Sequence, residues 1–321
     1  SQQAIIEASR CVQCGMCHDS CPTHMHAPEY IRAIWEGKAE EAVRQIYQSN
    51  PFSQVCGRVC TRRCETACSI GRRGEPVAIR WLKRYAMDAV SDARIRQIAA
   101  EDKVDYISGK KVAVIGAGPA GLTAAFDLVK KGHEVTVFEA MEKPGGMTRY
   151  GIPEYRLPYD RLDADVEVIT SLGVQIRYNT CIGKDVSLQE LERDYDAVVV
   201  AIGLQKGRST RIPGSNHRQV KKAVSLLRKI TRGDTFDVPR SAVVIGGGNV
   251  AMDIARSLAR LQKQQHGEVK ITVAALESFD HFLADQEEVT ESREEGIEIL
   301  DSRGPKQILI DDQDKLTGLA T

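Results

Sequence analysis

The stretch "KKVAVIGAGPAGLTAAFDLVKKGHEVTVFEA", Lys110 to Ala140, decides the fold of this chain. An apolar run leads into the glycine turn "GAGPAG", and a helical pattern and a second apolar run follow. Glu139 ends that second run, 23 positions after Gly116. This order of strand, glycine turn, helix, strand and acid predicts a Rossmann-like dinucleotide site, where glycines let the backbone approach a pyrophosphate at the helix N-terminus. The alternative, a tight turn that binds nothing, is disfavoured by the complete pattern.

The same order of elements returns at "SAVVIGGGNVAMDIARSLARL", Ser241 to Leu261, followed by the strand-like "VKITVAAL". Alanine stands at the third glycine position of "GGGNVA". Two such openings predict two nucleotide sites in one chain. Between them, "AIGLQKGRSTRIPGSNHR" is rich in Gly, Pro and basic residues, which indicates a crossover linker.

The composition is that of an ordinary globular protein. Its 321 residues suggest two or three domains, and 44 basic residues balance 44 acidic ones. This balance gives no indication of nucleic-acid binding. No apolar run approaches the roughly 20 residues that a membrane span needs, and the first residues show no signal-peptide pattern. We therefore expect a cytoplasmic protein without a membrane span.

Cysteines form two groups near the N-terminus, since eight of the nine precede residue 69. The groups lie in "CVQCGMCHDSCP" and "CGRVCTRRCETAC" and comprise Cys11, Cys14, Cys17, Cys21, Cys56, Cys60, Cys64 and Cys68. In a chain otherwise built like a cytosolic enzyme, this distribution favours metal over disulfides. Structural zinc is the alternative, but C-x2-C-x2-C-x3-C-P is the ferredoxin-type pattern. We predict two [4Fe–4S] clusters.

Basic residues surround the second cysteine group. They are Arg58, Arg62, Arg63, Arg72, Arg73, Arg80, Lys83 and Arg84, opposed only by Glu65 and Glu75. Because a four-thiolate cluster is anionic, nearby cations stabilise its reduced form and raise its potential. A solvated basic face that docks a partner is the alternative, and both can hold.

Four motifs resemble the glutamate synthase small-subunit family of flavoprotein oxidoreductases: "VAVIGAGPAGLTAA", "PGGMTRYGIPEYRLP", "AIG" and "VIGGGNVAMDIARSLARL". This family includes the N-terminal part of dihydropyrimidine dehydrogenase and the large subunit of bifurcating ferredoxin:NADP transhydrogenase. The resemblance, which extends over nearly the whole chain, implies an α/β fold. It implies an α-helical double [4Fe–4S] domain at 1–108, then Rossmann-like domains for FAD at 109–205 and NAD(P) at 206–321. Relatives continue with a segment that completes the FAD domain, so this chain, which stops at "LTGLAT", is expected to be a fragment or a partial structure.

The resemblance also implies where the cofactors bind. The adenosine and pyrophosphate of FAD would contact Gly116, Ala117, Gly118, Pro119, Ala120, Gly121 and Glu139. The flavin half would lie along Gly145, Gly146, Met147 and Arg156, with Ile182 near the adenine. The nicotinamide nucleotide would bind at Gly246, Gly247, Gly248, Asn249, Val250 and Ala251.

No catalytic acid–base residue is predicted, because hydride transfer between two rings needs alignment more than an acid or base. Four histidines are interpreted as surface or structural residues: His133, His217, His266 and His281. Cys181, interpreted as an isolated strand residue, has no C-x-x-C partner. That absence argues against a disulfide mechanism like that of thioredoxin reductase.

The end of the second strand of the second unit indicates the coenzyme. NADPH-using relatives carry a Tyr-Arg-Arg pattern there, whereas alignment through "FLADQEEV" places Ala275, Leu276 and Glu277 at these positions. A carboxylate accepts hydrogen bonds from a free ribose 2′-hydroxyl and repels a 2′-phosphate. We therefore expect NADH rather than NADPH. The alternative is that Glu277 faces solvent and Arg256 or Arg260 reaches a phosphate.

The ferredoxin rule and the family pattern together imply interleaved cluster ligation. One quartet would be Cys11, Cys14, Cys17 and Cys68, and the other Cys21, Cys56, Cys60 and Cys64. Some relatives place Gln or Glu as a cluster ligand at the position of Lys83, and lysine is a poor substitute.

The expected function is that of an iron–sulfur flavoprotein subunit. NADH would deliver hydride to FAD, and the clusters would carry single electrons to or from other redox subunits of a larger complex, because nicotinamide works in two-electron steps. Whether the flavin bifurcates electrons stays open. Two other functions stay open as well: a glutamate synthase small subunit that uses NADPH, and an electron-transfer scaffold with a silent nucleotide site.

Overall fold

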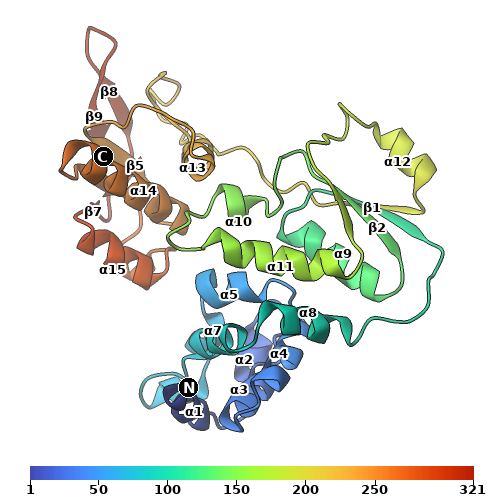
Figure 1. Ribbon diagram of the computed structural model, residues 1–321. Coiled ribbons are helices and arrows are strands. Elements are labelled where there is room, and N and C mark those ends of the chain that lie inside the picture. The colour runs from blue at the N-terminus through green and yellow to red at the C-terminus, as the bar shows by residue number, and fades with distance from the viewer. The chain divides into compact units, whose positions relative to one another are not determined.

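The computed structural model describes residues 1–321, which divide into two compact units (Figure 1). One unit comprises Ser1–Arg149 and Glu154–Gly203, and the other comprises Tyr150–Pro153 and Leu204–Thr321. A helical N-terminal part is followed by two parallel sheets, which confirms the predicted α/β fold class.

The N-terminal part of the first unit is entirely helical. Its elements are α1 (Gln2–Ser9), α2 (Met16–Ser20), α3 (Ala27–Trp35), α4 (Ala39–Tyr47), α5 (Ser53–Val59), α6 (Arg63–Thr66), the 3-10 helix η1 (Ser69–Arg72), α7 (Ile79–Ala89) and α8 (Asp92–Ala100). Gly37, with a left-handed φ of 74°, separates α3 from α4. Ile31, Ile34 and Ile46 of these two helices are buried, so the apolar faces of the helices form the core of this part.

A four-stranded parallel sheet in the order β3-β2-β1-β4 forms the rest of the first unit. Its strands are β1 (Lys111–Ile115), β2 (Glu134–Phe138), β3 (Gln175–Arg177) and β4 (Ala197–Val200). The helices that follow these strands are α9 (Pro119–Lys130), α10 (Met147–Tyr150), α11 (Tyr159–Ser171) and α12 (Leu188–Asp194). α9 contacts β1, β2 and β4, while Leu191 of α12 packs with Ala113, Ile115 and Phe138. The central strands are therefore buried on both faces, as parallel sheets require.

The cysteine-bearing helices and this sheet belong to one compact unit because α11 contacts α5 and α8. Asp165 of α11 is fully buried and accepts hydrogen bonds from the backbone N–H groups of Gln54 at 3.1 Å and Val55 at 3.0 Å. Both groups belong to the first turn of α5, where N–H groups have no intrahelical partner. A carboxylate from the sheet part thus caps the helix that carries Cys56.

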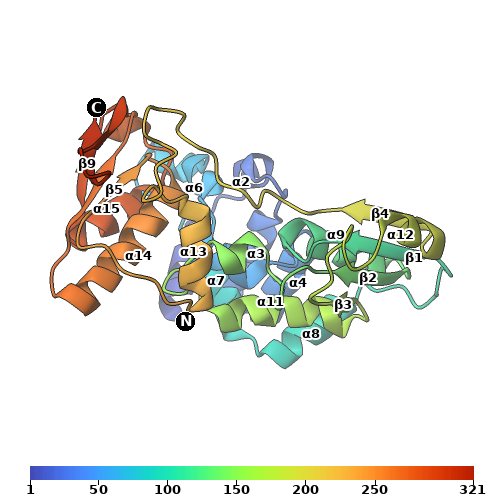
Figure 2. The ribbon, with the colours of Figure 1, turned by 90° about the horizontal axis from the view of Figure 1, so that it is seen from above.

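The second unit contains a parallel sheet in the order β5-β6-β7. Its elements are α13 (Ala223–Arg232), β5 (Ala242–Ile245), α14 (Asn249–His266), β6 (Ile271–Ala274), the 3-10 helix η2 (Phe279–His281), α15 (Gln286–Glu294), β7 (Glu298–Leu300) and the antiparallel hairpin β8 (Gln307–Ile310) and β9 (Leu316–Ala320). α14 packs on β5, β6, α13 and α15, and Figure 2 shows α13 beside α14. Met252, Ala255 and Leu258 of α14 lie in the core of this unit.

Two loop regions complete the description. After β4, the chain runs to α13 through turns and irregular backbone, and the N–H of Ile308 donates to the Pro213 carbonyl at 3.0 Å. The interpretation of Cys181 as a strand residue is wrong: it lies exposed in a loop, because its N–H bonds the Asp185 carboxylate at 2.8 Å and turns the chain. None of the helices combines the length and the apolar character that crossing a bilayer requires.

Candidate functional site

Four cysteines drawn from both groups line one small cavity: Cys11, Cys14, Cys17 and Cys68. Apolar side chains complete most of its wall, namely Val12, Pro28, Ile31, Ile70, Val77 and Ile79. Gly15 brings the first three cysteines together, since its left-handed φ of 80° turns the chain into α2. These four residues form the quartet that interleaved ligation requires.

Two thiols of this first quartet, those of Cys11 and Cys17, resist ionisation. Burial, with a smaller contribution from Cys11, raises the pKa of the Cys17 thiol to about 11. Burial also raises the pKa of Cys11, against hydrogen bonds from Gln13, and Cys14 and Cys68 add to the rise. Apposed thiols in an apolar wall ionise together only when a positive group joins them. Four sulfur donors around one cavity suit iron, so the residues fit a [4Fe–4S] cluster.

The second quartet collects around Cys60 and Cys64. Burial, followed by the neighbouring Cys60, raises the pKa of the Cys64 thiol to about 12, and Cys21 adds to the rise. Burial likewise raises the pKa of Cys60, against a hydrogen bond from the Arg62 N–H, and Cys56 contributes to it. No three His, Cys, Asp or Glu side chains of the chain converge as ligands of a single metal ion. The interactions of Cys64 place Cys21, although it belongs to the first sequence group, near the second group, and they include Cys17 as well.

The basic residues near the cysteines divide into buried and exposed ones. Arg58, with a side chain 7% exposed, pairs with Asp88 at 2.8 Å. The Arg80 guanidinium donates to the Cys60 carbonyl at 3.2 Å, and Lys83 is 5% exposed. The exposed ones are Arg63, Arg72 and Arg73. Both predicted roles are thus represented: cations among the cysteines, and a solvated basic face.

The first glycine turn leaves no room for a side chain at Gly116 or Gly121. Gly116 has a φ of 106°, and a Cβ on it would lie 2.5 Å from the Ala201 carbonyl oxygen. A Cβ on Gly121 would lie 2.0 Å from the carbonyl oxygen of Gly116. These contacts hold α9 tightly against the end of β1, with Pro119 and Ala120 exposed at the helix N-terminus. That exposed N-terminus is where a pyrophosphate would be bound.

Glu139 lies directly on this turn. Its carboxylate accepts hydrogen bonds from the N–H groups of Ala117 at 2.7 Å and Met141 at 2.8 Å, and the residue is 7% exposed. The Thr180 N–H donates to the Glu139 carbonyl at 2.9 Å, and Ile182, two residues further on, packs on the sheet core. The acid is therefore held where the ribose of a dinucleotide would lie.

A second glycine pair packs on the first turn. The Gly145 N–H donates to the Ala117 carbonyl at 2.7 Å, and a Cβ on Gly146 would lie 2.9 Å from the Gly118 Cα. Arg149, which sequence reasoning missed, anchors this loop: its buried guanidinium donates to the Pro144 carbonyl at 2.6 Å and pairs with Asp163. Arg149 lies within the motif "PGGMTRYGIPEYRLP", but the resemblance assigned it no role. Two other residues were predicted to contact the flavin half of FAD. Met147 begins α10, and Arg156 lies in the loop before α11.

The second glycine turn repeats this geometry with one difference. Gly246 has a φ of 126°, and its N–H donates to the Ala274 carbonyl at 2.9 Å. A Cβ on Gly246 would lie 3.9 Å from the Cβ of Ala251, so α14 stands far enough from the turn for alanine to replace the third glycine. Asn249 accepts a hydrogen bond from the Asp285 N–H at 2.9 Å, and Val250 is half-exposed at the helix N-terminus.

Glu277 lies beside Gly247 of the second turn, which corresponds in the motif to Ala117, the residue whose N–H Glu139 binds in the first. Its Oε2 lies 3.2 Å from the position a Cβ on Gly247 would take. Gly248, the next residue of the turn, has open space around it. The carboxylate therefore faces the glycine turn.

Arg256 is engaged elsewhere. It is 3% exposed and pairs with Glu288 at 2.5 Å, Glu291 at 2.7 Å and Glu295 at 2.7 Å. Arg260 shares Glu295 at 2.7 Å. Two carboxylates of α15 and that of Glu295, the residue that follows this helix, hold the Arg256 guanidinium in the α14–α15 packing. It is therefore not directed at a phosphate, as the alternative interpretation required.

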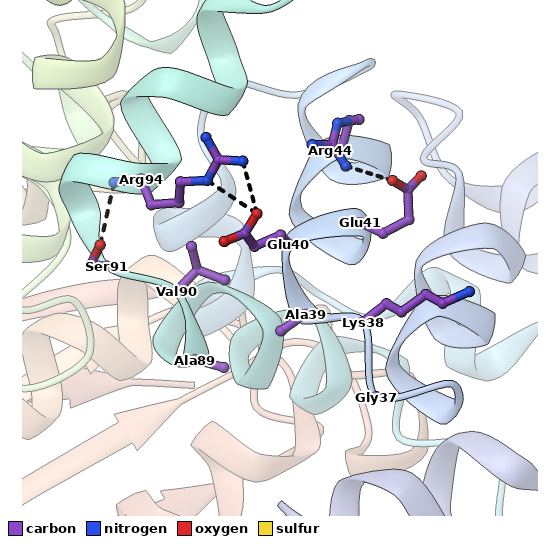
Figure 3. Close-up of a pocket in the computed structure, with 10 residues that line it drawn as sticks. All are labelled: Gly37, Lys38, Ala39, Glu40, Glu41, Arg44, Ala89, Val90, Ser91 and Arg94. Carbon is purple, nitrogen blue, oxygen red and sulfur yellow. Dashed lines mark hydrogen bonds and ion pairs between the residues drawn. The ribbon is translucent and has the colours of Figure 1, made fainter.

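One open pocket lies away from the cysteines and the glycine turns (Figure 3). Gly37, Lys38 and Ala39 line it on one side, and Ala89 and Val90 on the other. Its charged residues pair within the wall: Arg94 with Glu40 at 2.8 Å and Arg44 with Glu41 at 2.5 Å. Because these groups satisfy one another, we assign this pocket no part in the site.

Comparison with known families and proteins agrees with this architecture. Residues 1–95 match the family described as dihydropyrimidine dehydrogenase domain II, 4Fe-4S cluster. Residues 110–321 match the pyridine nucleotide-disulphide oxidoreductase family. Among solved structures, the fold is similar to FprA, a Mycobacterium tuberculosis oxidoreductase, with a TM-score of 0.56 at 19% identity over 64% of this chain and 62% of that one.

Three characterised relatives resemble the chain in sequence. The beta subunit of NADP(+)-dependent formate dehydrogenase from Moorella thermoacetica is 42% identical over 76% of this chain and 38% of its own length. The PreT subunit of the Escherichia coli NAD-dependent dihydropyrimidine dehydrogenase is 36% identical over 94% of this chain and 72% of its own. The small chain of Escherichia coli NADPH glutamate synthase is 32% identical over 99% of this chain and 69% of its own.

A 4Fe–4S domain ahead of a pyridine-nucleotide oxidoreductase domain defines the class of protein. The chain belongs to the glutamate synthase small-chain family of iron–sulfur flavoprotein oxidoreductases, as its motifs indicated.

Proposed function

We propose that this chain passes electrons between NADH, FAD and two [4Fe–4S] clusters, and exchanges them with a partner subunit of a larger complex. One observation carries the proposal: both cysteine quartets and the first glycine turn belong to the same compact unit. The Asp165 cap on α5 and the contacts of α11 with α5 and α8 join the two parts. The flavin site and the clusters that exchange electrons with it would thus lie in the same compact unit.

In this proposal each group of residues has a distinct task. The backbone of the Gly116–Gly121 turn holds a pyrophosphate, and Glu139 accepts hydrogen bonds from ribose hydroxyls. The two cysteine quartets hold iron, while Arg80 and Lys83 compensate the negative charge of the thiolates. A bound flavin would supply the exchange between two-electron hydride transfer and one-electron transfer to the clusters.

The preference for NADH rests on Glu277. Its carboxylate lies against the second glycine turn, where the adenosine ribose of a dinucleotide would bind. Arg256 is bound to three glutamates and so offers no guanidinium to a 2′-phosphate. The relatives themselves carry names with either coenzyme, NAD for PreT and NADP or NADPH for the formate dehydrogenase and glutamate synthase subunits.

The first expected result is reduction of bound flavin by NADH. With purified protein under anaerobic conditions, mixing with NADH should bleach the flavin band in stopped flow, and absorbance of the clusters should fall afterwards as electrons move on. Flavin that stays oxidised would favour the scaffold function. Reduction by NADPH alone, together with co-purification of a glutaminase-bearing subunit, would favour the glutamate synthase function.

The second expected result concerns iron. Anaerobic analysis should give about eight iron and eight sulfide per chain. Cys68→Ser should lose about half of the iron by removing a ligand from the first quartet, and Cys56→Ser should lose the other half. Cys181→Ser, which changes an exposed cysteine outside both quartets, serves as the matched control and should keep all of it. Zinc in place of iron, or about four irons in the unmodified protein, would contradict the assignment.

A further inference from the structure

Lys83 is a buried lysine beside the second cysteine quartet. It lies on α7, is 5% exposed, and its Nζ stands 4.0 Å from the Sδ of Met25. Met25 is itself 6% exposed, and its backbone hydrogen-bonds the Cys21 thiol. The ammonium of Lys83 therefore ends near Cys21 and not in solvent.

The packing of α5 on α7 brings Lys83 toward Cys60 as well. Gly57 of α5 allows close approach, since a Cβ on it would lie 3.3 Å from the Cα of Arg84. Arg80, three residues before Lys83 and on the same face of α7, donates to the Cys60 carbonyl at 3.2 Å. Consistent with this placement, the Lys83 charge acts to lower the pKa of the Cys60 and Cys21 thiols.

A buried ammonium needs negative charge around it. The carboxylate that interacts with the Lys83 charge is that of Asp165. Burial raises the pKa of Asp165 to about 7, and the charge of Lys83 acts in the opposite direction. Asp165 already accepts the N–H groups of Gln54 and Val55. Because Asp165 already binds these two N–H groups, thiolates of the quartet would supply further negative charge to the buried cation.

We propose that Lys83 is a tuning residue whose fixed positive charge, not a metal–ligand bond, raises the reduction potential of the cluster held by Cys21, Cys56, Cys60 and Cys64. The inference rests on the proposed function, because it requires that second cluster. An ammonium has no lone pair to donate to iron, but it stabilises the added electron of a reduced cluster through the low-dielectric interior. The cluster near Lys83 would thus accept an electron more readily than it would beside an uncharged residue.

The test is an EPR-monitored redox titration of the purified holoprotein at pH 8.5, where Asp165 is ionised. Lys83→Met, similar in length but uncharged, should lower the reduction equilibrium constant of one cluster at least tenfold, about 59 mV for one electron. Lys83→Arg should hold the potential near that of the unmodified protein, because arginine keeps the charge. Asp165→Asn should shift the same cluster in the opposite direction. Lys38→Met makes the same change at an exposed lysine of this part and should shift neither cluster.

Iron content separates the possible failures. Only four irons in the unmodified protein would overturn the proposed function and this inference together. Eight irons with unchanged potentials in Lys83→Met would overturn the inference alone, as would a Lys83→Arg protein that behaves like Lys83→Met. Loss of four irons in Lys83→Met with an unshifted potential in Asp165→Asn would also overturn it, since Lys83 would then support the fold and not the potential.

Discussion

Replacing Glu277 by arginine is expected to shift the coenzyme preference toward NADPH. The rate constant of flavin reduction divided by the dissociation constant should rise for NADPH relative to NADH by at least about a hundredfold. The Glu277 carboxylate lies on the glycine turn, with its Oε2 3.2 Å from where a Cβ on Gly247 would stand. There it would accept hydrogen bonds from ribose hydroxyls and repel a 2′-phosphate. Arginine reverses both effects, because its guanidinium binds phosphate by paired hydrogen bonds and no longer accepts them from the hydroxyls.

Anaerobic stopped flow with each coenzyme measures this change over a range of concentrations. Glu294→Arg provides the same reversal of charge at an exposed position of α15, and it should leave the ratio of the two coenzymes within about twofold. Equal or better reduction by NADPH in the unmodified protein would contradict the proposed coenzyme. An unchanged ratio in Glu277→Arg would show that this side chain does not contact the ribose.

Gly121→Ala is expected to remove most of the bound flavin. A Cβ at this position would lie 2.0 Å from the Gly116 carbonyl oxygen and 3.1 Å from a methyl group of Val114. The clash is with backbone, so relief requires α9 to move away from β1, and the N–H groups of the turn move with it. We expect a flavin content below about a tenth and a loss of stability of roughly 3 kcal/mol.

Flavin absorbance after gel filtration and thermal unfolding of the apoprotein measure these two effects separately. Gly74→Ala is the matched control, because a Cβ there meets nothing within 4 Å and the residue is exposed. It should keep its flavin and unfold within a few degrees of the unmodified protein. A Gly121→Ala protein with full flavin content would mean that α9 can stand further from the turn, as α14 does beside Ala251.

Local sequence predicted the two nucleotide turns because every part of each lies within about thirty residues. Glycine spacing, apolar runs and a terminal acid all describe neighbouring backbone, and the structure places Glu139 and Glu277 on their turns as those patterns indicated. The interpretation of Cys181 as a strand residue was wrong, because the Asp185 carboxylate accepts a hydrogen bond from the Cys181 N–H and turns the chain there.

The sequence by itself determined the α/β fold class and the residue types able to hold iron and nucleotides, because these follow from local spacing and periodicity. Its motifs indicated the family by resemblance. The tertiary structure placed Cys68 in one cavity with Cys11, as the ferredoxin rule and the family pattern implied, and it alone showed Lys83 buried near Cys21. It alone also showed that Arg256 pairs with three carboxylates. It showed as well that Asp165 accepts a hydrogen bond from the N–H of Val55 in α5, 110 residues away in the sequence. The physical reason is that burial and charge pairing depend on which helices pack together, and contacts between residues so far apart leave no periodic trace in the chain.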